Sequence, residues 1–349
     1  MTIHISDNNR CDSGCQNPSP RVSVVHIKDN LGLGKPLKLG ADPELVVAAV
    51  EDKTDYSGNK FTEVTKLHGD EDLSRYRTER DKELKIEDDL HWVELRPEPS
   101  VTPTEATLKV KDAMLALRNL IRRAKRNRHG INKKYKVYTG GGEVVKDTLG
   151  GHIHISWEDV PWNEIWCEGH RSGSSEQATY NKYNKMLKPL GRLLDWFISI
   201  PLQKAVGGKR YINNCNSEDC STNYANRYAR LSAFRGTFYN ENNRVVRGVE
   251  YRSPPSALKS PDLYYAVMEI AWRIVNLCYE KQNVTFRLKG SPKFEDYIKL
   301  GVSRKSAEVM SKLRRHQIGG PVKFGLWAKW EPPATEEEVL GQVRMTFIS

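Results

Sequence analysis

The stretch Gly150-Gly151-His152-Ile153-His154-Ile155 decides how the rest of the chain is interpreted. Successive side chains of a β-strand point to opposite faces, so residues two apart share a face. Both imidazoles would therefore project from one side of a strand that begins directly after a glycine pair. The apolar isoleucines would project from the other side. The pattern predicts a strand with one core face and one face that carries chemistry.

Three other segments repeat this spacing with charged side chains: Gly-Ala-Asp-Pro-Glu at 40–44, Val-Glu-Leu-Arg at 93–96 and Val-Glu-Tyr-Arg at 249–252. Carboxylates with few nitrogen ligands beside them favour Mg²⁺ or Mn²⁺. In two segments an arginine follows the glutamate by two residues, and a planar guanidinium binds carboxylate or phosphate through paired hydrogen bonds. Ion pairs on a solvated sheet face are the alternative. Together the four segments predict a site for metal and phosphate on one face of a sheet.

The segments around these motifs predict an α+β fold. Strand patterns occupy roughly 37–50, 91–96, 135–139, 151–157, 227–240 and 244–252, and helical patterns occupy roughly 102–130, 177–206, 260–277, 292–300 and 303–316. The clearest helix opens with a capping box that starts at Thr102. Because the strands come in adjacent pairs, we expect an antiparallel or mixed sheet with helices on one side. The polar residues of the four motifs would then lie on the uncovered, concave face.

The length of 349 residues allows one large domain or two ordinary ones. Residues 1–30 are expected to form a flexible tail, and residues 31–349 a single domain. Within that domain, residues 51–90 are charged and weakly periodic, which predicts an exposed insertion. Residues 322–349 look partly strand-like.

Charge and apolar content narrow the class of protein. No apolar run approaches the ~20 residues that span a bilayer, and the N-terminus lacks the apolar region of a secretory signal. We therefore expect a soluble cytoplasmic protein with no membrane partner. The net charge of +11 fits either a solvated basic face or an anionic partner such as nucleic acid. The cysteine pairs Cys11/Cys15 and Cys215/Cys220 are too loosely spaced to favour structural zinc.

A basic stretch precedes the last motif. Arg227, Arg230 and Arg235 could present guanidinium groups to a polyphosphate, and a plain basic strand and turn is the alternative. The two histidines also leave a zinc site open, because a His-x-His pair can ligate zinc.

Taken in order along the chain, the four motifs resemble those of the phage-type COOH–NH2 ligases, the phiEco32-like amidoligases. That family is similar to glutamine synthetase and glutamate–cysteine ligase in fold and chemistry. The resemblance implies a curved, mostly antiparallel sheet that forms a funnel-like site, with helices on its outer face. It implies that ATP and Mg²⁺, or Mn²⁺ in its place, bind there. The implied metal ligands are Glu44, Glu94, His154 and Glu250.

The resemblance also assigns roles to the remaining polar residues. Arg252 resembles the arginine that contacts the carboxylate substrate or the transferred phosphate, and Arg96 and Arg235 are weaker candidates for the same role. His152, Arg230 and Arg235 are expected to bind the nucleotide.

The activity that the resemblance implies is ATP-dependent joining of a carboxylate to an amine, with an acyl phosphate as intermediate and ADP and phosphate as products. The substrates would be small molecules or peptides, nucleic acid would be possible but not required, and a phage-encoded enzyme would act in the host cytoplasm. Two alternatives remain open. A nucleic-acid-binding protein would bind in a salt-sensitive way, and a zinc hydrolase built on His152 and His154 would need no ATP.

Overall fold

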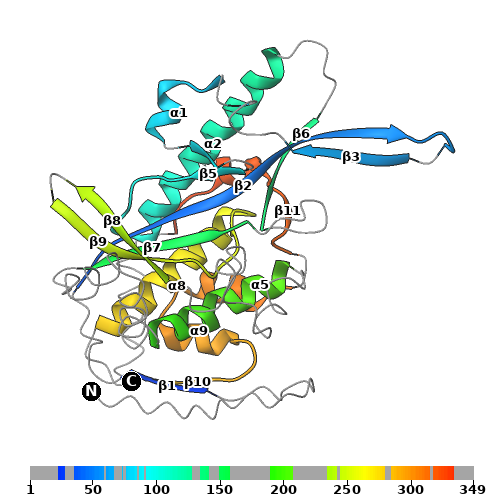
Figure 1. The fold of residues 1–349 in the computed structure, drawn as a ribbon. Coiled ribbons are helices and arrows are strands. Elements are labelled where there is room, and N and C mark those ends of the chain that lie inside the picture. The colour runs from blue at the N-terminus through cyan, green and yellow to red at the C-terminus, as the bar shows by residue number, and fades with distance from the viewer. Residues whose placement is uncertain are drawn as a thin grey trace, which may run out of the picture.

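The computed structural model describes residues 23–27, 35–58, 60–66, 73, 76–84, 86–89, 92–127, 134–140, 149–157, 189–206, 234–241, 244–279, 284–314 and 317–333. Within these residues the main feature is a nine-stranded sheet, and every strand pair in it is antiparallel. Helices and strands are mixed along the chain, so the predicted α+β class with an antiparallel sheet is confirmed. The sheet is open and uncurled (Figure 1), and a funnel of the glutamine synthetase type is not confirmed.

The long strand β2 (Pro36–Thr54) organises the sheet. Its first half pairs with β7 (Gly151–Trp157), and its middle pairs with β5 (Trp92–Leu95). Its distal half lies between β6 (Lys134–Thr139) and β3 (Lys60–Lys66). The outer strands extend this arrangement: β9 (Arg244–Tyr251) pairs with β7, β8 (Phe234–Glu241) with β9, β4 (Ile86–Asp89) with β5, and β11 (Gly320–Pro321) with β6.

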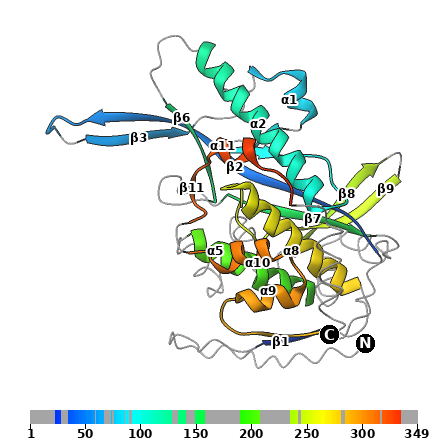
Figure 2. The ribbon, with the colours of Figure 1, turned by 180° about the vertical axis from the view of Figure 1, so that it is seen from behind.

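Two long helices cover one face of the sheet. The helices α2 (Pro103–Asn127) and α8 (Pro261–Tyr279) contact each other and β2, and both lie in front of the sheet in Figure 2. The odd-numbered residues of β2, such as Leu39 and Leu45, pack into this core together with Ile153 of β7. The smaller elements are η3 (Asp195–Ser199), α5 (Ile200–Val206), α9 (Phe294–Leu300), α10 (Arg304–Ser311) and α11 (Phe324–Lys329). No helix in the described part of the chain is both long and apolar enough to cross a bilayer.

The expected flexible tail over 1–30 is wrong for one segment. Residues Ser23–Ile27 form β1, which pairs in antiparallel register with β10 (Val284–Leu288). Val25 of β1 is buried in the main core. An apolar, β-branched segment therefore gains a pairing partner more than 250 residues away, which the local sequence could not indicate. The rest of that tail lies outside the described residues.

The expected exposed insertion over 51–90 needs a correction in its second half. The β2–β3 hairpin projects from the body, and Tyr56 at its turn is fully exposed. In contrast, Leu73, Asp81 and Ile86 are buried. The C-terminal expectation also changes, because residues Phe324–Lys329 form a helix rather than a strand.

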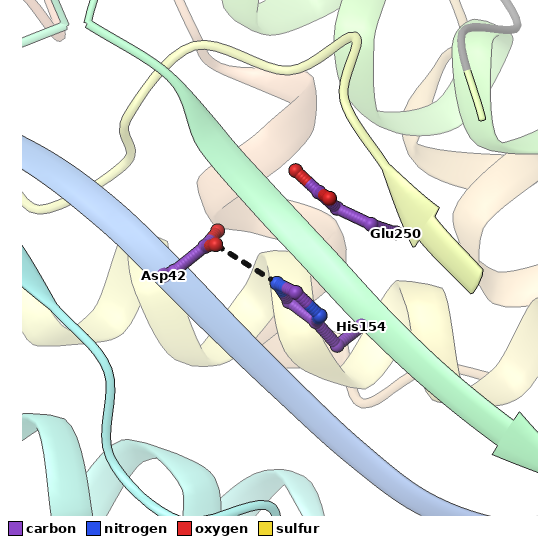
Figure 3. Close-up of side chains that lie close together, drawn as sticks. All are labelled: Asp42, His154 and Glu250. Carbon is purple, nitrogen blue, oxygen red and sulfur yellow. Dashed lines mark ion pairs between the residues drawn. The ribbon is translucent and has the colours of Figure 1, made fainter. Parts of the chain in front are cut away.

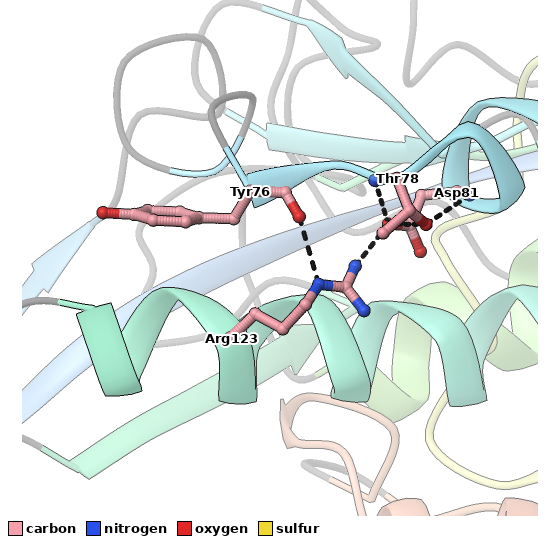
Figure 4. A network of polar contacts seen from close by, with 4 residues as sticks. All are labelled: Tyr76, Thr78, Asp81 and Arg123. Carbon is pink, nitrogen blue, oxygen red and sulfur yellow. Dashed lines mark hydrogen bonds and ion pairs between the residues drawn. The ribbon is translucent and has the colours of Figure 1, made fainter.

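Asp81 explains why this polar segment folds back. It lies in the short helix α1 (Glu79–Glu83), where it completes a capping box with Thr78. Its Oδ2 accepts hydrogen bonds from the Thr78 backbone N–H at 2.7 Å and the Thr78 hydroxyl at 2.8 Å. The same oxygen pairs with the guanidinium of Arg123 on α2 (Figure 4). Arg123 also donates to the Tyr76 carbonyl at 3.1 Å, so one arginine docks the segment on the long helix.

Replacing Asp81 with alanine is expected to lower the free energy of unfolding by about 2 kcal/mol, because a buried acceptor of several hydrogen bonds is lost and Arg123 is left facing the gap. Chemical denaturation measures this. The control is Glu79→Ala, which removes an exposed carboxylate of the same helix and should change stability by less than about 0.5 kcal/mol. Equal effects of the two variants would contradict the docking role of Asp81.

Candidate functional site

The polar residues of the four motifs share one face of the sheet, as the spacing predicted. The register places Asp42 opposite His152, His154 opposite Glu250, and Glu44 opposite Glu94. The residues between them belong to the core on the helix side, so the polar side chains project from the other side. Most of these residues are nevertheless little exposed, because the side chains of Asp42, His152 and Glu250 pack against one another.

Two imidazoles hold the carboxylates together. His152 Nδ1 lies 3.2 Å from Asp42 Oδ1 and 3.1 Å from Glu250 Oε1. His154 Nε2 lies 3.0 Å from Asp42 Oδ2. Figure 3 shows Asp42, His154 and Glu250 converging from three neighbouring strands, β2, β7 and β9. Groups that are far apart in sequence thus meet where these strands run side by side.

Two sets of side chains have the composition and spacing of a metal site. One set is Asp42, His154 and Glu250, and the other is Asp42, Glu94 and His152; in each set the potential ligand atoms lie within 4.8 Å of one another. Asp42 belongs to both sets. Each set offers two carboxylate oxygens and one imidazole nitrogen, which fits Mg²⁺ or Mn²⁺ better than a nitrogen- or sulfur-rich zinc site.

Glu44 belongs to neither set. Its Oε2 accepts a hydrogen bond from the Gly150 backbone N–H at 2.6 Å, and its own backbone N–H donates to the Gly150 carbonyl at 2.9 Å. Glu44 nevertheless lies directly opposite Glu94 in the register. Like charges in this position destabilise a strand pair unless a cation or proton lies between them. The Arg96 guanidinium, 2.6 Å from Glu94 Oε2, offsets part of this repulsion.

The glycine pair before His152 has a steric explanation. A Cβ atom on Gly150 would overlap Nε2 of the His152 ring, and a Cβ on Gly151 would lie 2.7 Å from the Pro255 carbonyl oxygen. The two glycines therefore avoid two different steric clashes. Gly150 leaves space for the imidazole, and Gly151 allows β7 to approach the chain after β9.

The arginines lie beside the glutamates that precede them by two residues. Arg96 Nη2 is 2.6 Å from Glu94 Oε2 and is half exposed, whereas Arg252 Nε is 3.0 Å from Glu250 Oε1 and is largely buried. Arg235 lies opposite Glu250 in the β8–β9 register, but its side chain is not among those described. Arg227 and Arg230 lie outside the described residues, as do Cys11, Cys15, Cys167, Cys215 and Cys220.

The ionisation of the site is shifted in several ways. Burial alone would raise the pKa of Asp42, but the charges and hydrogen bonds of both imidazoles lower it well below its ordinary value. Burial would also raise the pKa of Glu250, but the hydrogen bond and charge of His152 lower it overall. Burial would lower the pKa of His152, but its hydrogen bonds to Asp42 and Glu250 outweigh burial and raise that pKa to about 10. Burial and the Asp42 charge raise the pKa of Glu94 to about 8.

These shifts predict how the metal-free protein responds to pH. Glu94 and His152 both hold their protons more tightly in the folded state than in the unfolded state. Their contribution to the free energy of unfolding is therefore fully present below the pKa values of the unfolded chain, and it is lost as pH rises through about 8 for Glu94 and about 10 for His152. We therefore expect the melting temperature in chelator to fall between pH 6.5 and 8.5, measured by differential scanning fluorimetry. Glu94→Gln should make this fall shallower, because only His152 then contributes. The same slope in both proteins would contradict the prediction.

Sequence reasoning placed Asp42 on the correct face but gave it no ligand role. The signal was the Asp-Pro-Glu spacing, which puts residues 42 and 44 on the same side of a strand. Which of Asp42 and Glu44 can act as a ligand depends on which carboxylate accepts the hydrogen bond from the Gly150 backbone. That contact joins residues 106 positions apart.

With this geometry in view, comparison with known families is informative. Residues 39–162 match the family model described as Phage phiEco32-like COOH.NH2 ligase-type 2. The match confirms the resemblance over the first three motifs, and the fourth, at 248–252, lies beyond the matched segment. No curated protein matches the chain. The family's description names a carboxylate–amine ligase, the kind of activity that the resemblance implied.

Proposed function

We propose that this protein is an ATP- and Mg²⁺-dependent carboxylate–amine ligase that acts through an acyl phosphate, with a site related to that of glutamine synthetase. The observation that carries the proposal is the pair of buried acidic sets that share Asp42, most of whose members lie within the family match. A site of this kind would bind the metal-bound triphosphate of ATP.

The donor chemistry supports magnesium or manganese. The proposed ligands by geometry are Asp42, Glu94, His152, His154 and Glu250, and Glu44 remains the ligand that the motif resemblance implies. Each set contains a single imidazole, so His152 and His154 do not act as one nitrogen pair. This division counts against the zinc hydrolase built on both histidines.

The reaction that this site would catalyse has two steps. An oxygen of the substrate carboxylate attacks the γ-phosphorus of ATP, and the bond to the ADP oxygen breaks. The amine then attacks the acyl carbon, loses a proton and expels phosphate, which leaves an amide. A bound divalent ion would neutralise the charge on the phosphate oxygens during the transfer.

The residues of the chain would contribute orientation and charge. Arg252 and Arg96 lie beside the proposed ligands Glu250 and Glu94, from where a guanidinium can reach an anionic group of either substrate. His152 holds Asp42 and Glu250 at fixed positions. Water would have to be kept away from the acyl phosphate, which it would otherwise hydrolyse.

The substrates we propose are a small-molecule or peptide carboxylate and an amine. The proposed location is the cytoplasm, which for a phage-encoded enzyme is that of the host. The net charge of +11 also allows a substrate attached to nucleic acid, although the mechanism does not require one.

The test is ADP release from Mg·ATP in the presence of pooled amino acids, amines and a small-molecule extract. Wild type should release ADP only when the pool is present, and mass spectrometry should find a condensed product. Glu250→Gln should lose this activity, whereas Glu308→Gln, the same charge change on the exposed face of α10, should retain it. A folded wild-type protein that neither turns over nor binds Mg·ATP would refute the proposal.

A further inference from the structure

A buried polar network lies behind the site, on the core side of β9. Tyr251 stands between Glu250 and Arg252, and strand alternation sends its side chain to the opposite face. There it is fully buried, and its hydroxyl donates to Asp195 Oδ1 at 2.5 Å and lies 2.6 Å from Ser199 Oγ. Both partners belong to η3, a single π-helical turn closed by a hydrogen bond from the Ile200 N–H to the Asp195 carbonyl.

The same helical segment also contacts Ser253, the residue that follows Arg252 after the end of β9. Gln203 of α5, one turn beyond η3, donates from Nε2 to the Ser253 carbonyl at 3.2 Å. Arg252 is thus flanked along the chain by two residues that are anchored from behind, one through its side chain and one through its backbone. Its own Nε lies 3.0 Å from Glu250 Oε1 on the site face.

Packing alone gives no reason for these groups. Asp195, Ser199 and Gln203 are all buried, and a buried carboxylate costs free energy even when it is hydrogen-bonded. A phenylalanine at position 251 with a leucine at 195 would fill a comparable volume without that cost. Buried polar networks instead fix a unique arrangement of the elements that they join. Here the joined elements are a π-helical turn and the strand end that carries Glu250 and Arg252.

We propose that Tyr251, Asp195 and Gln203 form a positioning clamp that holds the Arg252 guanidinium where an anionic group of a substrate binds. The proposal rests on the proposed function, since it specifies how that site places its arginine. The clamp residues are positioning residues, because they act through Arg252 and lie on the face of the sheet away from the substrates.

The test uses the full chain with Mn²⁺ and inorganic phosphate as the probe for the anion, and the phosphate affinity is measured by calorimetry. Tyr251→Phe should weaken phosphate binding about tenfold. The matched control is Tyr297→Phe, which removes another buried hydroxyl that bonds the same π-helical turn, at the Phe197 carbonyl rather than through β9. The control should stay within about twofold of wild type, although both variants should lose similar thermal stability.

Two further variants separate positioning from general weakening. Asp195→Asn keeps an acceptor oxygen for the tyrosine and should retain the phosphate affinity. In an Arg252→Ala background, Tyr251→Phe should cause no further loss, because the clamp acts through that arginine. Equal losses in Tyr251→Phe and Tyr297→Phe, or additive losses in the double variant, would overturn the clamp.

The outcomes also separate the clamp from the proposed function. If wild type releases no ADP but binds phosphate through Arg252, the ligase proposal fails and the clamp is still judged by the variants. If wild type turns over and Tyr251→Phe behaves like Tyr297→Phe, only the clamp fails. A wild-type protein that binds no phosphate at all would overturn the clamp directly.

Discussion

Replacing Asp42 with asparagine is expected to lower both Mn²⁺ affinity and ligase activity about 10³-fold, a loss of ~4 kcal/mol. Asp42 is the one residue common to both potential metal sets, and it contacts both imidazoles. The substitution keeps the volume and one acceptor oxygen but removes the charge. The fold should therefore persist, which circular dichroism checks, while manganese titration by electron paramagnetic resonance reports the loss.

Glu44→Gln is the matched comparison, and it sets geometry against motif resemblance. The resemblance assigns the ligand role to Glu44, whereas in the structure its carboxylate accepts a hydrogen bond from the Gly150 N–H. An amide oxygen can accept the same bond, so we expect Glu44→Gln to stay within about tenfold of wild type. If Glu44→Gln is as severe as Asp42→Asn, Glu44 is a ligand after all and the assignment by geometry is wrong.

The difference between these two carboxylates shows how far the sequence could lead. Period-two alternation was sufficient to pair residues 42 with 44, 94 with 96, 152 with 154 and 250 with 252 on one face of each strand, because a strand fixes that geometry locally. The long helices were also predictable, since α2 carries a capping signal and α8 an apolar stripe. Each of these features is encoded within a single segment.

The features that the sequence could not predict depend on contacts between distant segments. The contact of Asp42 with His154, the pairing of β1 with β10 and the docking of Asp81 on Arg123 each join segments at least 40 residues apart. The π-helical turn behind Tyr251 has no recognisable local signature either. Such contacts decide which of several suitable side chains, such as those of Asp42 and Glu44, takes part in the site. The sequence alone could not make that distinction.

Substitutions of the glycine pair should separate the site from the fold. Gly150→Ala is expected to reduce Mn²⁺ affinity and ligase activity about 100-fold, because its Cβ would overlap the His152 ring and displace it from Asp42 and Glu250. An imidazole can rotate away, so the free energy of unfolding should fall by only about 1 kcal/mol. Manganese titration and guanidinium denaturation of the same preparation measure both effects.

Gly151→Ala should show the reverse pattern. Its Cβ would meet the backbone of Pro255 and Ser256, which cannot rotate away as a side chain can. We expect the free energy of unfolding to fall by about 3 kcal/mol, with the folded fraction retaining most of its metal affinity. Neighbouring residues would then divide the two roles, because Gly150 faces the imidazole and Gly151 faces the packed chain after β9. Parallel losses of affinity and stability in both variants would mean instead that the glycine pair supports the site only by supporting the fold.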